Sequence, residues 1–246
     1  MKISVITATW NSALTVEDTI RSLIAQDYPD IEYIIVDGAS TDSTLDIVRR
    51  YGDRIAVVVS EKDKGIYDAL NKGIALATGD VVGFLHSDDF FADDRVLSRI
   101  AEAFVKRSLG AVYGDLDYVS KSDTTKIVRR WVSGSFKRSK FRNGWMPPHP
   151  TFYMRREHYL SLGSFDLKFS IAADYDSMLR YLWTNNISAT YIPSVLITMR
   201  VGGESNQSLL NILKKTKEDR VAMIGNGIPP VRGLLLKNLS KIQQFF

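Results

Sequence analysis

The segment with the clearest chemical content joins an apolar run, residues 81–85, to two adjacent carboxylates, Asp88 and Asp89. Acids at the carboxyl end of a parallel strand lie at the mouth of the crevice where open α/β sheets bind ligands. Adjacent carboxylates repel each other, and Mg²⁺ or Mn²⁺ shared with substrate phosphate oxygens removes that repulsion. We therefore expect a divalent-metal site at Asp88 and Asp89. The alternative is that these acids, like Asp93, only cap a helix that begins near Arg95.

A third carboxylate, Asp37, follows the apolar run 33–36 in the same way. An acid at such a strand end is well placed to accept hydrogen bonds from a ribose hydroxyl or a base N–H. The chain has no GxxxxGK[ST] motif, and the turn after its first expected strand has no glycine. Both the P-loop and the dinucleotide fingerprint are therefore missing. A bound diphosphate would have to be held by metal and side chains.

A parallel sheet with crossover helices would place these acids at one edge. The alternation of β-branched runs with helical patterns predicts such a sheet. Strands are expected at residues 2–8, 31–36, 54–59 and 81–85, with helices at 16–26, 41–50 and 66–77. Further along the chain we expect strands at 112–119 and 125–131, a basic loop at 137–142 and a helix at 175–183. The expected fold class is α/β.

Five blocks, taken in order, resemble the family 2 glycosyltransferases. They are residues 6–11 (ITATWN), 36–44 (VDGASTDST), 63–73 (DKGIYDALNKG), 77–80 (ATGD) and 84–89 (FLHSDD). The resemblance implies the GT-A fold, a Rossmann-like, mixed, mostly parallel sheet flanked by helices, and a place among enzymes of bacterial polysaccharide and lipopolysaccharide assembly. It also implies a catalytic domain at 1–206, with a nucleotide-binding half (1–95) and an acceptor-binding half (96–206), followed by a basic amphipathic helical tail (207–246).

The resemblance implies a donor nucleotide site built from residues near strand ends: Thr7, Thr9, Asp37, Asp63 and Asp88. It also implies metal ligands at Asp88 and Asp89, which match the end of the DxD motif of the family. His86 stands where that motif has its first acid. A histidine at this point is more often a packing or hydrogen-bonding residue than a ligand. The number of protein ligands on the metal stays open.

Transfer of a sugar also needs a base that takes the proton of the acceptor hydroxyl. Residues 171–180 are similar to the late Glu-Asp-Tyr-Asp motif of the family, with Ala173 in place of the glutamate. The matched base is Asp174, and Asp176 is the second choice. Asp174 is also a candidate N-cap of the following helix, a role compatible with catalysis. The resemblance alone implies an inverting single displacement.

Three residues are expected to contact the acceptor or the diphosphate: His149, Trp145 and Arg200. Neighbouring prolines restrict the backbone around His149. Trp145 would stack on a sugar face. Arg200 would reach a phosphate as the glycine-containing loop after it closes. The alternatives are a buried hydrogen-bonding imidazole, a core tryptophan and a solvated arginine.

Composition describes an ordinary globular chain of 246 residues, 45% hydrophobic and 24% charged. The absence of cysteine excludes disulfides and thiolate metal sites and fits a reducing cytoplasm. No signal peptide pattern or membrane-spanning apolar stretch is visible, so a cytoplasmic location is expected. The net charge of +4 favours an anionic partner.

Residues 207–246 contain seven lysines and arginines against Glu218 and Asp219, so their net charge of +5 exceeds that of the whole chain. Basic residues beside apolar ones suit an interfacial helix on the inner, anionic face of the cell membrane. The alternative is that the helices pack on the catalytic domain with their lysines in solvent.

These patterns predict a metal-dependent, inverting hexosyltransferase that uses a nucleotide-diphosphate sugar, expected to be a UDP-sugar. Its acceptor would be a hydroxyl of a glycan or lipid-linked molecule in cell-surface polysaccharide synthesis, and no nucleic acid partner is expected. A sugar nucleotidyltransferase would want a glycine-rich basic loop after the first strand, which residues 7–12 do not supply. A non-catalytic nucleotide-sugar binding protein would have no use for a base at Asp174.

Overall fold

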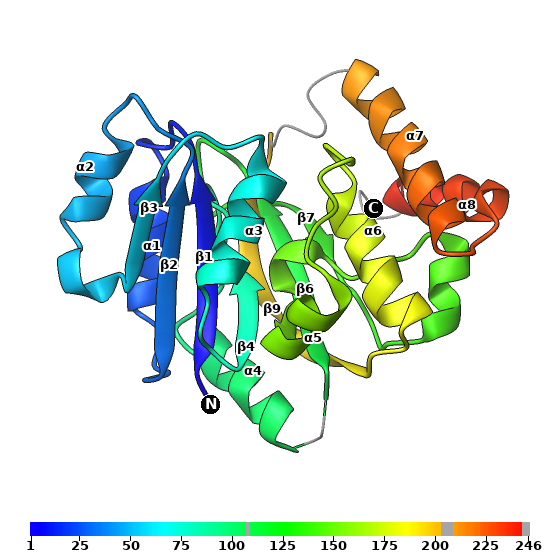
Figure 1. Ribbon diagram of the computed structural model, residues 1–246, viewed down its shortest axis with the longest axis horizontal. Coiled ribbons are helices and arrows are strands. Elements are labelled where there is room, and N and C mark those ends of the chain that lie inside the picture. Colours follow the sequence, from blue (N-terminus) through cyan, green and yellow to red (C-terminus); the bar gives the residue numbers. More distant parts are fainter. Residues whose placement is uncertain (107–108, 203–208, 243–246) are drawn as a thin grey trace.

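The computed structural model of the chain describes residues 1–106, 109–202 and 209–242. In this part of the chain, nine strands form one curled sheet with helices on both faces (Figure 1). The strands are β1 (Ile3–Thr9), β2 (Ile31–Asp37), β3 (Val57–Ser60), β4 (Val81–Phe84), β5 (Phe90–Phe91), β6 (Ala111–Val119), β7 (Ile127–Trp131), β8 (Tyr153–Arg155) and β9 (Ala189–Arg200). The helices are α1 (Val16–Ile24), α2 (Thr44–Arg49), α3 (Ile66–Leu76), α4 (Val96–Lys106), α5 (Arg156–Leu162), α6 (Ala173–Met178), α7 (Leu209–Gly225) and α8 (Pro230–Ile242).

The amino-terminal half is parallel, in the order β3-β2-β1-β4. In this register Thr9 lies opposite Asp37, and Asp37 lies opposite Ser60. The carboxyl ends of these strands therefore meet at one edge of the sheet, as the α/β prediction requires. Beyond β4 the sheet is mixed, because β8 runs antiparallel between β4 and β6, whereas β6 and β9 are parallel.

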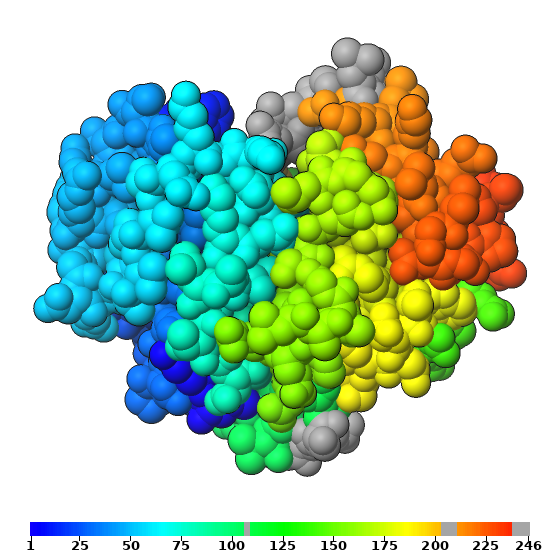
Figure 2. All heavy atoms as spheres, viewed as in Figure 1, coloured from blue at the N-terminus to red at the C-terminus, as the bar shows by residue number. Residues whose placement is uncertain are grey.

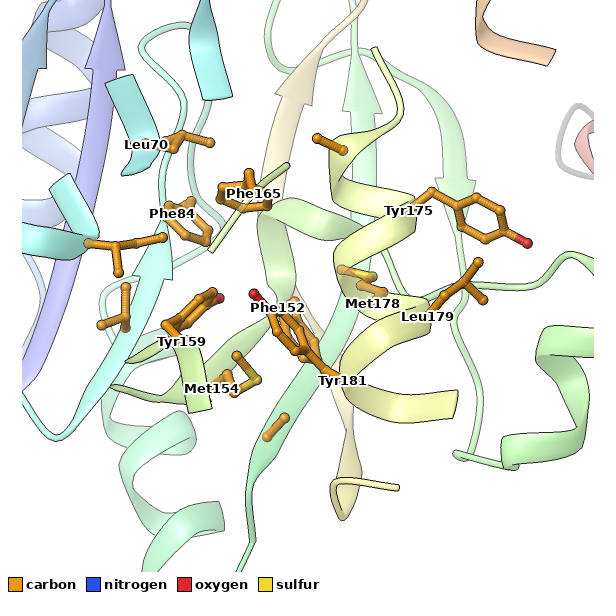
Figure 3. Packing of buried hydrophobic residues seen from close by; sticks show 14 of the residues in the cluster. Leu70, Phe84, Phe152, Met154, Tyr159, Phe165, Tyr175, Met178, Leu179 and Tyr181 are labelled. Atoms are coloured by element: carbon orange, nitrogen blue, oxygen red, sulfur yellow. The ribbon is translucent and has the colours of Figure 1, made fainter. Parts of the chain in front are cut away.

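Two apolar cores cover the two faces of the sheet. Alternate residues of β1 face opposite ways, so that Ile3 and Val5 join one core and Ile6 joins the other. This burial on both faces explains why the strand is continuously apolar. In the core that contains Ile6, Phe84 of β4 packs against Phe165, with ring centroids 5.5 Å apart, and Figure 3 shows the two rings to the left of α6. That core therefore joins the amino-terminal half of the sheet to α6.

Four local predictions differ from the structure. The third strand begins at Val57, because residues 52–54 form a 3₁₀ turn that starts at Gly52 with φ 41°. The strand expected from residue 125 begins at Ile127, because residues 123–126 form a turn closed from the Lys126 amide to the Asp123 carbonyl. The basic segment expected as a loop is a 3₁₀ helix, Arg138–Asn143. The capping role expected for Asp174 was wrong, because α6 starts at Ala173 and its N-cap residue is Ala172.

The carboxyl-terminal helices form a hairpin of α7 and α8 that packs on α6 and on the 3₁₀ helix Arg138–Asn143 (Figures 1 and 2). Helix α8 crosses the 3₁₀ helix Arg138–Asn143 so closely that a Cβ atom on Gly144 would lie 2.3 Å from the Gly233 carbonyl oxygen. Met223 of α7 is fully buried and belongs to the core that contains Phe84. Among the described residues, no helix has the length and apolarity needed to span a membrane.

Candidate active site

Asp37 is completely buried at the end of β2, and the protein itself satisfies its carboxylate. One oxygen accepts hydrogen bonds from the Ser40 amide (2.9 Å) and the Ser60 hydroxyl (2.7 Å), and the other accepts one from the Ser40 hydroxyl. These bonds connect the ends of β2 and β3. They hold Asp37 in one orientation at the edge where the sequence places the nucleotide.

The two threonines of β1 lie in different surroundings. The Thr7 hydroxyl is in the interior, where it donates to the Leu85 carbonyl (2.7 Å) and lies 3.2 Å from the Tyr33 hydroxyl. Its observed contacts join β1 to the end of β4. The buried Thr9 hydroxyl has no hydrogen-bond partner within the described ranges. Of the two, Thr9 therefore retains a hydroxyl that a ligand could engage.

Asp63 packs against the turn that follows β2. Its Oδ1 accepts the Gly65 amide (2.8 Å), and a Cβ atom on Gly38 would lie only 2.5 Å from its Oδ2. Glycine at position 38 therefore permits the carboxylate to approach this turn. Trp10, which is 65% exposed, borders the same turn, because its Cδ1 would lie 3.4 Å from that Cβ. Sequence reasoning did not select Trp10, although an aromatic residue just beyond the end of β1 was a usable signal.

The acidic pair after β4 is asymmetric. Asp89 is fully buried, and neither carboxylate oxygen has a hydrogen-bond partner in the part of the chain that the structure describes. Burial, reinforced by the charge of Asp88, raises the pKa of Asp89 well above its usual value, and Arg200 opposes this only in part. Asp88 is half-buried, and its side chain makes no hydrogen bond or ion pair with any described residue.

A divalent cation fits this donor set. Buried carboxylate oxygens without partners are costly, and a cation at Asp89 would relieve that cost, while Asp88 adds an oxygen donor with no competing contact. No group of three or more histidine, cysteine or acidic side chains among the described residues is arranged to hold a metal. The remaining ligands would have to be diphosphate oxygens and water, as is common for Mg²⁺ sites.

Arg200, at the end of β9, is 7% exposed and already engaged. Its Nη1 donates to the Asp88 carbonyl (2.6 Å), and its Nη2 lies 2.5 Å from Oδ2 of Asp18. In this arrangement Arg200 ties the acidic segment after β4 to α1. The loop after Arg200 was expected to carry this residue toward a phosphate. Residues 203–208 of that loop lie outside the described residues.

Two histidines lie side by side next to this acidic segment. The rings of His86 and His149 are 6.0 Å apart, and His149 stacks on Phe84 at 5.1 Å and 25°. Burial lowers the pKa of His149 to about 4, although the charge of Asp174 acts in the opposite direction. Burial also lowers the pKa of His86, against the charges of Asp88 and Asp174. Both imidazoles are therefore neutral near pH 7.

Asp174 thus lies close enough to both histidines for its charge to act on them, although it follows His86 by 88 positions in the sequence. Its Oδ1 is 3.4 Å from the hydroxyl of Tyr67, a residue of α3 that the sequence reasoning did not select. Burial and the charge of Asp174 raise the pKa of Tyr67. Tyr67 lies inside the family-like block 63–73, and this position in the sequence could have identified it as a candidate site residue.

Asp176 occupies a different environment from Asp174. It is buried, lies 3.6 Å from Arg180 and accepts a hydrogen bond from the Asn226 side chain (3.2 Å). Burial raises the pKa of Asp176 against the opposing charge of Arg180. Its carboxylate is thus turned toward the hairpin rather than the histidines.

Trp145 belongs to an aromatic cluster between β6 and the 3₁₀ helix Arg138–Asn143. Its ring meets Tyr113 and Phe141 edge-on, at 5.9 and 5.4 Å, and the Lys140 ammonium lies 5.0 Å from its centre. The tryptophan is half-buried, so part of the ring remains open to solvent. This environment is compatible both with stacking of Trp145 on a sugar face and with packing of Trp145 as a core residue.

Comparisons with known proteins identify the family of this chain. The sequence profile described as "Glycosyl transferase family 2" matches residues 4–164. A PGL/p-HBAD biosynthesis glycosyltransferase of Mycobacterium bovis is 31% identical over 210 residues, which cover 82% of this chain and 78% of that protein. The chain belongs to glycosyl transferase family 2.

Solved structures show the same fold at low sequence identity. TarS of S. aureus matches all of this chain with a TM-score of 0.71 and 19% identity, but this chain spans only 44% of that TarS chain. The TarS 1–349 fragment in complex with UDP-GlcNAc matches with a TM-score of 0.70 and 18% identity, covering 96% of this chain and 70% of the fragment. The mannosyltransferase PcManGT from Pyrobaculum calidifontis, in complex with GDP-Man and Mn²⁺, matches with a TM-score of 0.65 and 19% identity, covering 98% and 74%. The fold is therefore that of the GT-A glycosyltransferases.

Proposed function

We propose that the protein transfers a hexosyl group, with inversion, from a UDP-sugar to a hydroxyl of a glycan or lipid-linked acceptor in the assembly of a bacterial cell-surface polysaccharide. One observation carries the proposal. Asp174, from the acceptor-side half, acts electrostatically on His86 and His149 beside Asp88, at the carboxyl end of β4. This electrostatic proximity supports a base on the acceptor side near the acidic pair, which an attack on a nucleotide sugar requires.

The donor side of the proposal assigns the diphosphate to the acidic pair. Asp88 and Asp89 would hold Mn²⁺ or Mg²⁺, which when bound neutralises charge on the departing diphosphate. Thr9, Asp37 and Asp63 would surround the nucleoside. The UDP-GlcNAc and GDP-Man complexes of the structural neighbours support a nucleotide-sugar donor.

The acceptor side assigns proton removal to Asp174. Its carboxylate would take the proton of the attacking hydroxyl, while the neutral His149 imidazole has a buried Nε2 without a partner in the described ranges. That nitrogen can bond to an acceptor or diphosphate oxygen. Trp145 offers a partly open ring for a sugar face. Arg200 would support the site through its bond to the Asp88 carbonyl.

We also propose that the hairpin surface rests on the anionic inner face of the membrane. The outward residues of α7 include Leu213 (67% exposed), Val221 (46%) and Ile224 (53%), interleaved with the exposed Lys214, Lys217 and Arg220. Apolar side chains between basic ones favour an interfacial location. A cytoplasmic enzyme bound there would be near lipid-linked acceptors.

The donor assignment is tested by thermal denaturation with a panel of UDP- and GDP-sugars in the presence and absence of Mn²⁺. A ligand that binds only the folded state raises Tm, by about 2.7 kcal/mol of stabilisation at one hundred times its Kd. With a UDP-sugar we expect a rise in Tm that depends on Mn²⁺. Asp88→Asn should abolish this rise, whereas the control Asp117→Asn, in strand β6, should leave it intact. A shift that survives Asp88→Asn in full would reject the metal assignment.

A further inference from the structure

Glu218 of α7 makes an unusual set of contacts with the turn that leads into α6. Its Oε2 accepts hydrogen bonds from the amides of Ile171 (2.8 Å) and Ala172 (3.0 Å). Its Oε1 accepts bonds from the hydroxyl (2.8 Å) and the amide (3.2 Å) of Ser170. One side chain from the hairpin therefore holds three consecutive residues of a segment 46 to 48 positions earlier in the chain.

The same turn is held on another side by Tyr67 of α3. The Tyr67 hydroxyl donates to the Ile171 carbonyl (2.7 Å) and lies 3.4 Å from Oδ1 of Asp174. Ile171 is thus bonded through its amide to the hairpin and through its carbonyl to the nucleotide-binding half. Asp174 is the second residue of α6, so the orientation of this turn determines where its carboxylate lies.

The Glu218 carboxylate is suited to this role because it stays charged. Burial acts to raise its pKa, but the amides of Ile171 and Ala172 and the two groups of Ser170 outweigh burial, and the pKa is lowered overall. Hydrogen bonds to an ionised acceptor are about twice as strong as bonds between neutral groups. The turn is therefore held by charge-assisted bonds.

Docking of the hairpin does not depend on Glu218 alone. Met223 is buried in the core, Lys237 lies 3.3 Å from the ring centre of Tyr175, and Asn226 bonds to Asp176. In Figure 3 the Tyr175 side chain projects from α6 on the side away from Phe165. These contacts fasten the hairpin to α6 itself, whereas the bonds of Glu218 all go to the turn before it.

We propose that Glu218 is a positioning residue for the catalytic base: it fixes the turn 170–172 and thereby holds Asp174 beside His86 and His149. The proposal rests on the proposed role of Asp174. It gives the hairpin a task in catalysis that is separate from any contact with a membrane.

The contact is tested by hydrogen exchange, which requires neither acceptor nor activity. In Glu218→Gln the charged acceptor is lost while size is kept, so we expect the amides of Ile171 and Ala172 to exchange at least roughly tenfold faster. Amides of β1 and β4, and all amides in the matched control Glu157→Gln at an exposed position of α5, should keep their wild-type rates. Unchanged exchange at 171 and 172 in Glu218→Gln would overturn the proposal.

The coupling to Asp174 is tested by hydrolysis of the nucleotide sugar that gives the largest thermal shift, with water as the acceptor and nucleotide release as the signal. We expect Glu218→Gln to lower kcat roughly tenfold with an unchanged KM, because misplacement of a catalytic group acts on the chemical step. In an Asp174→Asn background the same substitution should cost nothing further. If Glu218→Gln lowered kcat by the same factor in the Asp174→Asn background as in the wild type, the proposed coupling would be overturned.

The two arms separate failure of this inference from failure of the proposed function. An Asp174→Asn enzyme with full turnover would reject the base and with it the catalytic role of Glu218, whatever the exchange data show. An inactive Asp174→Asn enzyme together with a fully active Glu218→Gln enzyme would reject the positioning role alone. Loss of activity in the control Glu157→Gln would contradict the selectivity of the contact.

Discussion

At the scale of single residues, burial controls the charges in the site. His149 is stacked on Phe84 and kept neutral, whereas Asp174 lies half-exposed at the start of α6. A neutral imidazole can bond to a sugar or phosphate oxygen without adding charge. The carboxylate of Asp174, beside the imidazoles of His86 and His149, is the candidate base of the proposed reaction.

Replacement of Asp174 by asparagine should keep the shape of the site and remove the base. We expect turnover to fall by roughly 10²-fold or more, the usual scale for loss of a general base, with donor affinity unchanged. Asp176→Asn is the matched control, because Asp176 bonds to Asn226 and faces the hairpin. The comparison is made by steady-state kinetics and donor titration. Greater loss of turnover in the control would transfer the role to Asp176.

The depressed pKa of His149 makes stability depend on pH. Its pKa is about 4 in the folded state against 6.5 in the unfolded state, so protonation favours unfolding. The stabilisation is fully present above pH 6.5 and is lost as pH falls toward 4, by up to about 3 kcal/mol. Urea unfolding of wild type and His149→Gln between pH 7 and 4 measures this difference. Parallel stability curves for the two proteins would contradict it.

At the scale of elements, the junction of the two halves depends on close contact between β4 and β8. A Cβ atom on Gly83 would lie 2.0 Å from a ring carbon of Tyr153, a fully buried residue of β8. Glycine at position 83 is therefore required for the Tyr153 ring of β8 to lie against β4, its antiparallel neighbour in the sheet. Strand β4 ends at Phe84, three residues before Ser87, so the position of β4 also determines where the acidic segment lies.

Gly83→Ala should destabilise the fold because a methyl group and the Tyr153 ring cannot share this space. We expect a loss of about 1–3 kcal/mol, the usual range for overpacking a core. Gly225→Ala is the control: its Cβ meets nothing within 4 Å, and alanine in α7 should raise stability by up to about 1 kcal/mol. Chemical denaturation gives both values. Equal stability of Gly83→Ala and wild type would show that the ring moves aside at no cost.

At the scale of the whole molecule, the hairpin has two faces of different composition and burial. Its inner face is buried against α6 through Ala222 and Met223. Its outer face exposes apolar and basic residues together. The charge excess that the sequence shows in residues 207–246 is consistent with this arrangement, because lysines can remain in solvent while the inner face packs.

Membrane contact is predicted to depend on the outer face of α7. Replacing Lys214, Lys217 and Arg220 together by glutamate should lower sedimentation with phosphatidylserine vesicles at least tenfold, since each basic residue contributes about 1 kcal/mol near an anionic surface. The control replaces Lys121, Lys126 and Lys168, which are exposed elsewhere, by glutamate. Sedimentation and Tm are measured for both variants. Equal sedimentation of the two would reject the proposed surface.

The sequence by itself determined the alternation of strands and helices, the positions of Asp37 and Asp88 at the carboxyl ends of parallel strands, and the family. These features depend on short-range periodicity and on strand ends, which a single chain displays locally. The family motifs also placed Asp174 among the site residues before any contact was known.

Only the tertiary structure decided which partners those residues meet. It turned Thr7 inward to the Leu85 carbonyl, buried Asp89 and engaged Arg200 with Asp18. It also brought Glu218 onto the turn before α6. Such contacts join segments tens to nearly two hundred residues apart, and they follow from how whole elements pack rather than from any local pattern of residue types.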